Sequence, residues 1–161
     1  DTAVGQGTTF HVYLPAPAVA PEPDAAPAPE AARRGTGQRV LYIDDDEVMV
    51  LMIQRLLERA GFQVEVDTDA ARALERLRAQ PTDFDVAVTD FNMPHLSGLD
   101  VAAEVTTVRP DLPVVIGSGY VNDELRAQAA AAGVRALMRK EQSHEDLARL
   151  LKELLAAGAS A

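Results

Sequence analysis

The stretch VAVTDFNMPHLSG, residues 86–98, decides the fold. A short apolar run ends in a carboxylate, Asp90, and a Met-Pro turn then leads to Ser97, a residue type that often begins a helix. Such a run is typical of a buried strand. An acid at the end of a core strand is costly unless it is needed there. The stretch therefore predicts a core strand, a loop and a helix, with a functional carboxylate where the strand ends.

The same alternation of strand and helix extends outward from this stretch. Apolar runs predict strands at 39–43, 63–66, 85–89, 113–118 and 135–139. Amphipathic patterns predict helices at about 47–60, 70–79, 98–108, 122–132 and 144–156. The expected caps are Asp69, Ser97 and Ser143 at helix starts and Gly61 and Gly133 at helix ends. This alternation implies an α/β domain whose parallel sheet is covered by helices on both faces.

Composition excludes several classes of function. The chain has 161 residues and a net charge of −10, which argues against a nucleic-acid partner because phosphate binding needs clustered Lys and Arg. No cysteine is present, so disulfides and thiolate metal sites are excluded, and we expect a cytoplasmic location. No apolar run approaches the roughly 20 residues that span a bilayer, so we expect no direct membrane contact.

The first 38 residues differ in composition from the rest. Residues 15–38 hold six of the ten prolines and predict an extended, semi-rigid Pro/Ala-rich linker. Residues 1–14 are rich in Gly and Thr and end in a strand-like alternation. The expected organisation is an N-terminal remnant at 1–14, a linker at 15–38 and a domain at 39–158.

Polar residues gather where the predicted strands end, the edge at which open parallel sheets bind ligands. They are Asp44, Asp45, Asp46, Thr89, Asp90, Ser118 and Lys140. Clustered carboxylates repel one another, a hard divalent cation relieves that repulsion, and oxygen ligands favour Mg²⁺ over zinc. This set predicts a phosphoryl pocket in which Asp90 is the nucleophile, Mg²⁺ and Lys140 neutralise the phosphoryl oxygens, and Ser118 donates a hydrogen bond.

Four motifs in order also resemble one protein family. LYIDDDE (41–47), VTDFNMPHLSG (88–98), PVVIGSG (113–119) and ALMRK (136–140) resemble the receiver domain of two-component response regulators. The resemblance implies a flavodoxin-like, doubly wound, five-stranded parallel sheet of order 2-1-3-4-5.

By position, the resemblance also assigns roles to the site residues. It implies Asp90 as the acceptor of a phosphoryl group from phosphohistidine, Lys140 as the phosphoryl-binding cation and Ser118 as a switch hydroxyl. The implied metal ligands are Asp45, Asp90, the backbone carbonyl of Asn92, and Asp44 through a water molecule. A receiver of this kind catalyses only its own phosphorylation and dephosphorylation.

Two positions depart from the family pattern. Glu141 follows Lys140 where proline, usually in a cis bond, is expected. A cis bond before a residue other than proline costs about 3 kcal/mol, so we predict a trans bond or a reshaped loop. The second switch position holds Leu137 instead of an aromatic residue, so an output that needs a rotating ring is in question.

The amino-terminal segment GQGTTFHVYLP, residues 5–15, resembles the last glycine-rich turn and strand of a histidine-kinase ATP-binding domain. With the linker, it implies that this receiver is the carboxyl-terminal part of a hybrid sensor histidine kinase. The implied partners are the kinase's dimerisation and phosphotransfer domain and a histidine phosphotransfer protein.

Two alternatives remain open at this point. Asp44–Val48 match D-x-D-x-[TV], the signature of haloacid-dehalogenase-type phosphatases, in which Asp44 would be the nucleophile. The second alternative is a pseudo-receiver that is never phosphorylated and serves as a docking scaffold. Labelling with acetyl phosphate, compared between Asp90→Asn and Asp44→Asn, separates these hypotheses.

Overall fold

The computed structural model describes residues 2–3, 7–8, 37–140 and 144–158. The chain divides into two units, 1–30 and 31–161. In the first unit, β1 (Thr2–Ala3) and β2 (Gly7–Thr8) form one short antiparallel pair. The strand expected at the end of 1–14, most of the linker and the expected N-cap Ser143 lie outside the described residues.

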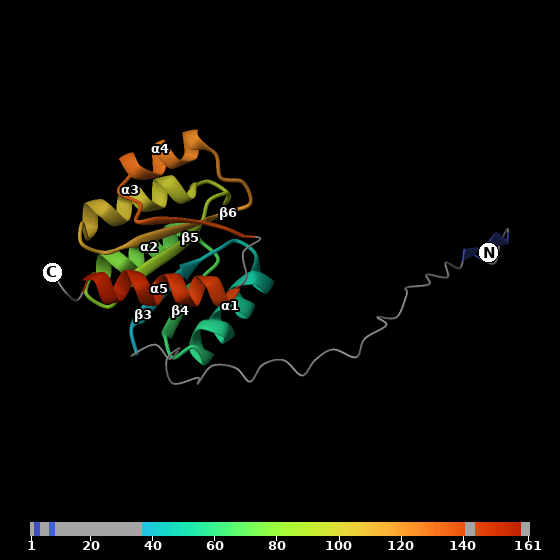
Figure 1. Ribbon diagram of the computed structural model, residues 1–161, viewed down its shortest axis with the longest axis horizontal. Helices are drawn as coiled ribbons and strands as arrows, with labels where there is room; N and C mark the ends of the chain where they lie inside the picture. Colours follow the sequence, from blue (N-terminus) through green and yellow to red (C-terminus); the bar gives the residue numbers. More distant parts are fainter. Residues whose placement is uncertain (1, 4–6, 9–36, 141–143, 159–161) are drawn as a thin grey trace, which may run out of the picture. The chain divides into compact units, whose positions relative to one another are not determined.

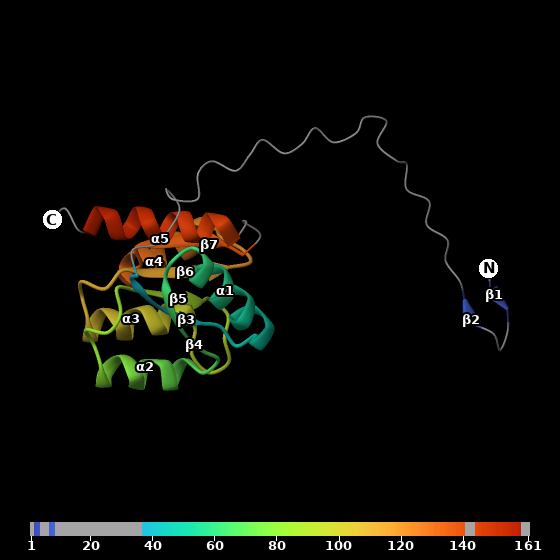
Figure 2. The same cartoon turned by 90° about the horizontal axis from the view of Figure 1, so that it is seen from below.

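The second unit contains a five-stranded parallel sheet with helices on both faces (Figures 1 and 2). The strands are β3 (Arg39–Ile43), β4 (Gln63–Asp67), β5 (Val86–Asp90), β6 (Val114–Ser118) and β7 (Ala136–Arg139). The helices are α1 (Glu47–Arg59), α2 (Ala70–Ala79), α3 (Gly98–Val108), α4 (Asp123–Ala131) and α5 (His144–Gly158). The sheet order is β4-β3-β5-β6-β7, which confirms the predicted order 2-1-3-4-5. None of the helices in this described part is long and apolar enough to cross a membrane.

The sheet has a hydrophobic core on each face because successive strand residues point to opposite sides. In β3, Leu41 and Ile43 pack with the core under α2 and α3, whereas Val40 and Tyr42 pack with the core under α1 and α5. Figure 2 shows α1 and α5 on one side of the sheet and α2 and α3 on the other. Burying each large aliphatic side chain contributes roughly 1.5–3 kcal/mol to the stability of the fold. The two cores together therefore fix the strands, and with them the residues at the strand ends.

Capping residues fix where the helices begin and end. Asp69 caps α2, and Ser97 forms a capping box with Asp100 at the start of α3, as predicted. Gly61 and Gly133 follow the caps of α1 and α4 with φ angles of 94° and 77°, a left-handed conformation that glycine adopts without strain.

The third acid of the IDDDE run has a structural task. The Asp46 side chain is the N-cap of α1 and accepts hydrogen bonds from the backbone N–H groups of Val48 and Met49. Asp44 and Asp45 are therefore not needed to cap this helix, and both are available for chemistry.

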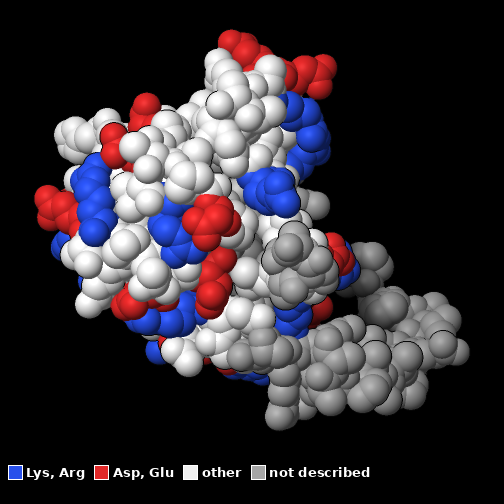
Figure 3. Space-filling model, turned by 90° about the vertical axis from the view of Figure 1, so that its left-hand side faces the viewer, with Lys and Arg blue, Asp and Glu red and all other residues white. Residues whose placement is uncertain are grey.

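Ion pairs are spread over the surface of this unit. Figure 3 shows one face on which basic and acidic side chains lie next to one another instead of gathering by sign. The pairs Arg78–Glu104 and Arg109–Asp111 are of this kind, at 2.6 and 2.7 Å. Exposed pairs such as these contribute little individually to stability.

Candidate functional site

The site lies at the carboxyl ends of β3 and β5. Asp44 directly follows β3 and is 0% exposed, and Asp90 ends β5 and is 6% exposed. Asp45, the next residue after Asp44, is exposed. The three side chains each offer an oxygen, and these oxygens lie within 4.8 Å of one another. The fold thus brings together three acids from two strands that adjoin in the sheet.

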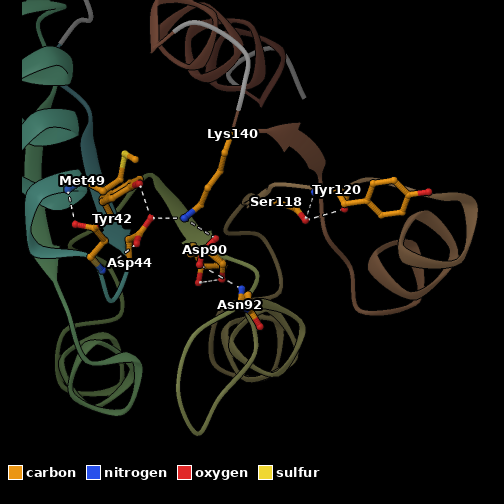
Figure 4. Close-up of polar contacts among 10 residues, drawn as sticks. Tyr42, Asp44, Met49, Asp90, Asn92, Ser118, Tyr120 and Lys140 are labelled. Atoms are coloured by element: carbon orange, nitrogen blue, oxygen red, sulfur yellow. Dashed lines mark hydrogen bonds and ion pairs between the residues drawn. The ribbon is translucent and has the colours of Figure 1, made fainter. Parts of the chain in front are cut away.

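Lys140 supplies a cation to this cluster. It directly follows β7, and its Nζ lies 2.9 Å from Asp44 Oδ2 and 2.9 Å from Asp90 Oδ1 (Figure 4). Burial alone would lower the pKa of Lys140, but its hydrogen bonds and ion pairs with Asp44 and Asp90 outweigh burial and raise that pKa. The ammonium group is therefore charged at neutral pH, and the cluster of three carboxylates keeps a negative balance.

Asp44 has two further donors. The Tyr42 hydroxyl donates to Asp44 Oδ2 at 3.1 Å, and the Asp46 backbone N–H donates to Asp44 Oδ1 at 3.1 Å. Burial, followed by the nearby carboxylates, raises the pKa of Tyr42, so its phenol stays protonated and donates. The sequence analysis missed Tyr42. Its position could have been predicted, because Tyr42 lies two residues before Asp44 on a strand and such residues point to the same face of the sheet.

The loop after Asp90 is held against the end of β5. The Asn92 backbone N–H donates to Asp90 Oδ2 at 3.3 Å. Gly98, the first residue of α3, lies so close that a Cβ there would be 2.5 Å from the backbone oxygen of Asp90 and 2.9 Å from the Cα of Phe91. Only glycine allows this approach. The requirement at Gly98 was also missed, because nothing in the sequence shows how near the helix packs to the strand.

The two expected switch residues lie outside the acid cluster. Ser118 Oγ donates to the backbone oxygen of Tyr120 at 2.8 Å and accepts from its N–H at 3.2 Å. Figure 4 accordingly shows the Ser118 hydroxyl directed toward Tyr120, away from Asp90. Leu137 is half-buried in β7 and packs against the core under α2 and α3. Glu141, and with it the predicted trans bond, lies outside the described residues.

The donor set fits a hard divalent cation. Asp44, Asp45 and Asp90 offer carboxylate oxygens, without histidine or cysteine in the group. Oxygen-only ligands suit Mg²⁺ or Ca²⁺ better than zinc. The exposed side of the group, at Asp45, gives an ion a path from solvent.

Comparison with protein families places this arrangement in context. The family model described as the response regulator receiver domain matches residues 40–152, which include Asp44, Asp45, Asp90, Ser118 and Lys140.

Individual relatives agree with that match. The sensor kinase CckA of Brucella abortus is 28% identical over 165 residues, an alignment that covers 96% of this chain and 17% of CckA. The response regulator receiver protein CpdR of the same organism is 29% identical over 120 residues, which cover 74% of this chain and 98% of CpdR. This chain therefore spans only about a sixth of the length of the kinase but nearly all of the single-domain relative.

Solved structures show the same fold. A response regulator receiver domain protein from Clostridium thermocellum has a TM-score of 0.70 at 27% identity, over 74% of this chain and 95% of that one. A CheY-like receiver domain protein from Methanospirillum hungatei has a TM-score of 0.72 at 25% identity, over 78% of this chain and 98% of that one.

Proposed function

The chain belongs to the response regulator receiver domain family of two-component signalling, and from that premise we propose that Asp90 accepts a phosphoryl group from a phosphohistidine in a magnesium-dependent reaction. One observation carries the proposal: Asp90 is nearly buried, contacts Lys140 at 2.9 Å and shares its surroundings with two further carboxylates. A surplus of buried acid is expensive to maintain, and a cation together with a phosphoryl group would use it.

The reaction transfers the phosphoryl group between two protein side chains. An Asp90 carboxylate oxygen attacks phosphorus, an O–P bond forms, the P–N bond to histidine breaks, and the ring nitrogen keeps the electron pair. A magnesium ion held by Asp45, Asp90 and the backbone carbonyl of Asn92, with Asp44 reached through a water molecule, would supply positive charge to the phosphoryl oxygens. Lys140, already beside Asp90, turns its ammonium group to one of those oxygens.

Ser118 completes the proposal as the switch hydroxyl. To donate to a phosphoryl oxygen on Asp90, it must give up its hydrogen bonds with the Tyr120 backbone. Phosphorylation would thereby change the connection between β6 and α4. Leu137, which packs in the core beside β6, is the second residue that we expect to shift.

Labelling with acetyl phosphate tests the proposal. The wild-type chain should take up phosphate when MgCl₂ is present and lose that ability with EDTA, and Asp90→Asn should reduce labelling to background. The phosphatase alternative, which the receiver-family match disfavours, instead predicts that Asp44→Asn abolishes labelling while Asp90→Asn spares it. A wild-type chain that never takes up phosphate would favour the scaffold alternative.

The exposed face of α1 is the docking surface that we propose for the phosphohistidine donor. Val48 is 75% exposed, Leu51 56% and Met52 38%, and their spacing puts them on one side of the helix. Because α1 begins directly after Asp44–Asp46, a helical domain seated on this face brings its histidine toward Asp90. Leu51→Arg should slow transfer from a phosphorylated kinase domain far more than labelling by acetyl phosphate.

We propose further that the parent protein is a hybrid sensor kinase whose receiver acts in the cytoplasm. The CckA alignment supports this because it covers 96% of the chain and so extends into the residues ahead of the receiver. Its donor would be the kinase's own phosphotransfer domain, or a histidine phosphotransfer protein would exchange the group with it.

A further inference from the structure

Tyr42 contacts the acid cluster, yet the phosphoryl transfer proposed above gives it no role. It is 6% exposed, its ring packs in the core under α1 and α5, and its hydroxyl donates to Asp44 Oδ2 at 3.1 Å. It also lines a small cavity of about 40 Å³ whose walls include Asp44, Asp90 and Lys140. Its ring therefore belongs to the core and its hydroxyl to the site.

Packing alone does not explain a tyrosine at this position. The neighbouring strand residues on this face, Val40, Val86 and Val88, are aliphatic and need no polar partner. A buried tyrosine hydroxyl must find an acceptor, and here the acceptor is a fully buried carboxylate. A hydrogen bond to an ionised acceptor is stronger and more directional than one between neutral groups.

The hydroxyl matters most when Lys140 leaves Asp44. Among the described residues, Asp44 Oδ2 accepts from Tyr42 and Lys140, whereas Oδ1 accepts from the Asp46 backbone N–H. If Lys140 turns to a phosphoryl oxygen, Tyr42 is the donor that stays on Oδ2. With a phenylalanine there, that buried oxygen would lose both of these partners, which is costly, and the Asp46 backbone N–H on Oδ1 would be the donor left to hold the carboxylate.

We propose that Tyr42 is a positioning residue: its phenol fixes the orientation of the Asp44 carboxylate for a divalent cation and keeps it fixed while Lys140 serves the phosphoryl group. Tyr42 acts through Asp44 and touches neither the cation nor the phosphoryl group. This inference deepens the proposed function and rests on it.

Isothermal titration of MgCl₂ into the whole chain, without a phosphate donor, tests the inference. Tyr42→Phe keeps the ring and removes only the oxygen. Outer-shell donors of this kind change metal affinity 10–100-fold, so we expect the dissociation constant for Mg²⁺ to rise about tenfold in Tyr42→Phe. The same substitution in an Asp44→Asn background should have little further effect, because the carboxylate that Tyr42 orients is gone.

Val40→Ala is the matched packing control. It removes core volume from the same strand and the same core but does not contact the acids, so it should lower the melting temperature and leave Mg²⁺ affinity unchanged. Equal Mg²⁺ affinity in wild type and Tyr42→Phe would overturn the role of Tyr42 and leave the proposed function standing. A tenfold loss that persists in the Asp44→Asn background would also overturn it, whereas a wild-type chain that binds no Mg²⁺ would overturn the metal site itself.

Discussion

At the amino end of the sheet Arg39 and its acidic partners are all partly exposed, whereas at the carboxyl end Asp44 and Asp90 are almost fully buried and share one partly exposed lysine. Arg39 pairs with Glu65 at 2.7 Å and with Asp83 at 3.0 Å, and these three side chains are 31–35% exposed. The Asp44 and Asp90 side chains are 1% and 6% exposed. Exposed pairs of this kind cost little to form, but buried acids need a reason to be kept.

Asp67 shows that burial at the carboxyl end is not by itself the distinguishing feature. It ends β4, is 3% exposed, and accepts three hydrogen bonds from Arg72: Nε donates to Oδ1 and Oδ2, each at 2.9 Å, and Nη2 donates to Oδ1 at 2.6 Å. Asp67 thus has a cation of its own, whereas Asp44 and Asp90 divide one between them. Among the described residues, the buried acids that share one cation are therefore Asp44 and Asp90, which we assign to the phosphoryl-transfer site.

Among the substitutions that test this comparison, replacing Lys140 should cause the largest loss of stability. Lys140→Met leaves Asp44 and Asp90 buried without a cation, and we expect a loss of about 3 kcal/mol in the free energy of unfolding in EDTA, the low end for breaking a buried pair. The low end applies because the Lys140 side chain is one third exposed. Urea denaturation measures the loss, and added MgCl₂ should recover much of it.

Lys152→Met is the matched control, since Lys140 and Lys152 are the two lysines of the chain. Lys152 lies on α5, and the ion pairs that the structure gives for Asp44 and Asp90 are with Lys140, so replacing Lys152 should change stability by less than about 1 kcal/mol and show no dependence on MgCl₂. If Lys140→Met and Lys152→Met lose the same amount of unfolding free energy, with the same response to MgCl₂, then the buried acids do not depend on Lys140 for their stability.

The sequence predicted this sheet more completely than it predicted the contacts within the site. Strand and helix bounds came within one or two residues, because short apolar runs and caps such as Asp69 and Ser97 are local signals. The gathering of Asp44, Asp90 and Lys140 was also predictable, because parallel strands end at one edge. The roles assigned to these residues stay predictions.

What the sequence could not supply depends on three-dimensional distance. The Tyr42 hydroxyl contacts Asp44 while its ring packs in the core under α1 and α5, and Gly98 is required because α3 begins against the backbone of Asp90. The orientation of Ser118 toward Tyr120 likewise follows from a loop geometry that no local pattern encodes. Side-chain direction, more than the identity of the residues, was the missing information.

The pH dependence of the Asp67–Arg72 pair gives a smaller test of the same comparison. Burial alone would raise the pKa of Asp67, but the hydrogen bonds from Arg72 outweigh it and hold that pKa below its usual range. A lowered folded-state pKa contributes stability above the unfolded pKa of about 3.9, and the contribution is lost as the pH falls through the folded value. Arg72→Ala should therefore lower the free energy of unfolding at pH 7, and the difference from wild type should shrink below about pH 4.

Arg78→Ala, on the same helix, is the control for this test. Its partner is Glu104, and both side chains are 48% exposed, so we expect a loss of less than about 1 kcal/mol. Denaturation curves at pH 7, 5 and 3 distinguish the two variants. A difference in unfolding free energy between Arg72→Ala and wild type that stays constant over this range would mean that Arg72 does not stabilise the fold through the ionised Asp67 carboxylate.

The smallest effect is expected at the amino end itself. Arg39→Ala removes two partly exposed ion pairs and the contact of the guanidinium with the Phe84 ring, whose centre is 5.6 Å away. The loss in unfolding free energy should be small and greatest at low salt. It should diminish in 1 M NaCl, where the screening length is about 3 Å.

Acetyl phosphate labelling of Arg39→Ala should proceed at the wild-type rate, because the amino ends of the strands lie at the opposite edge of the sheet from Asp90. Slower labelling in Arg39→Ala would show that charge at one end of the sheet influences chemistry at the other, and the division between a stabilising end and a reactive end would then be wrong.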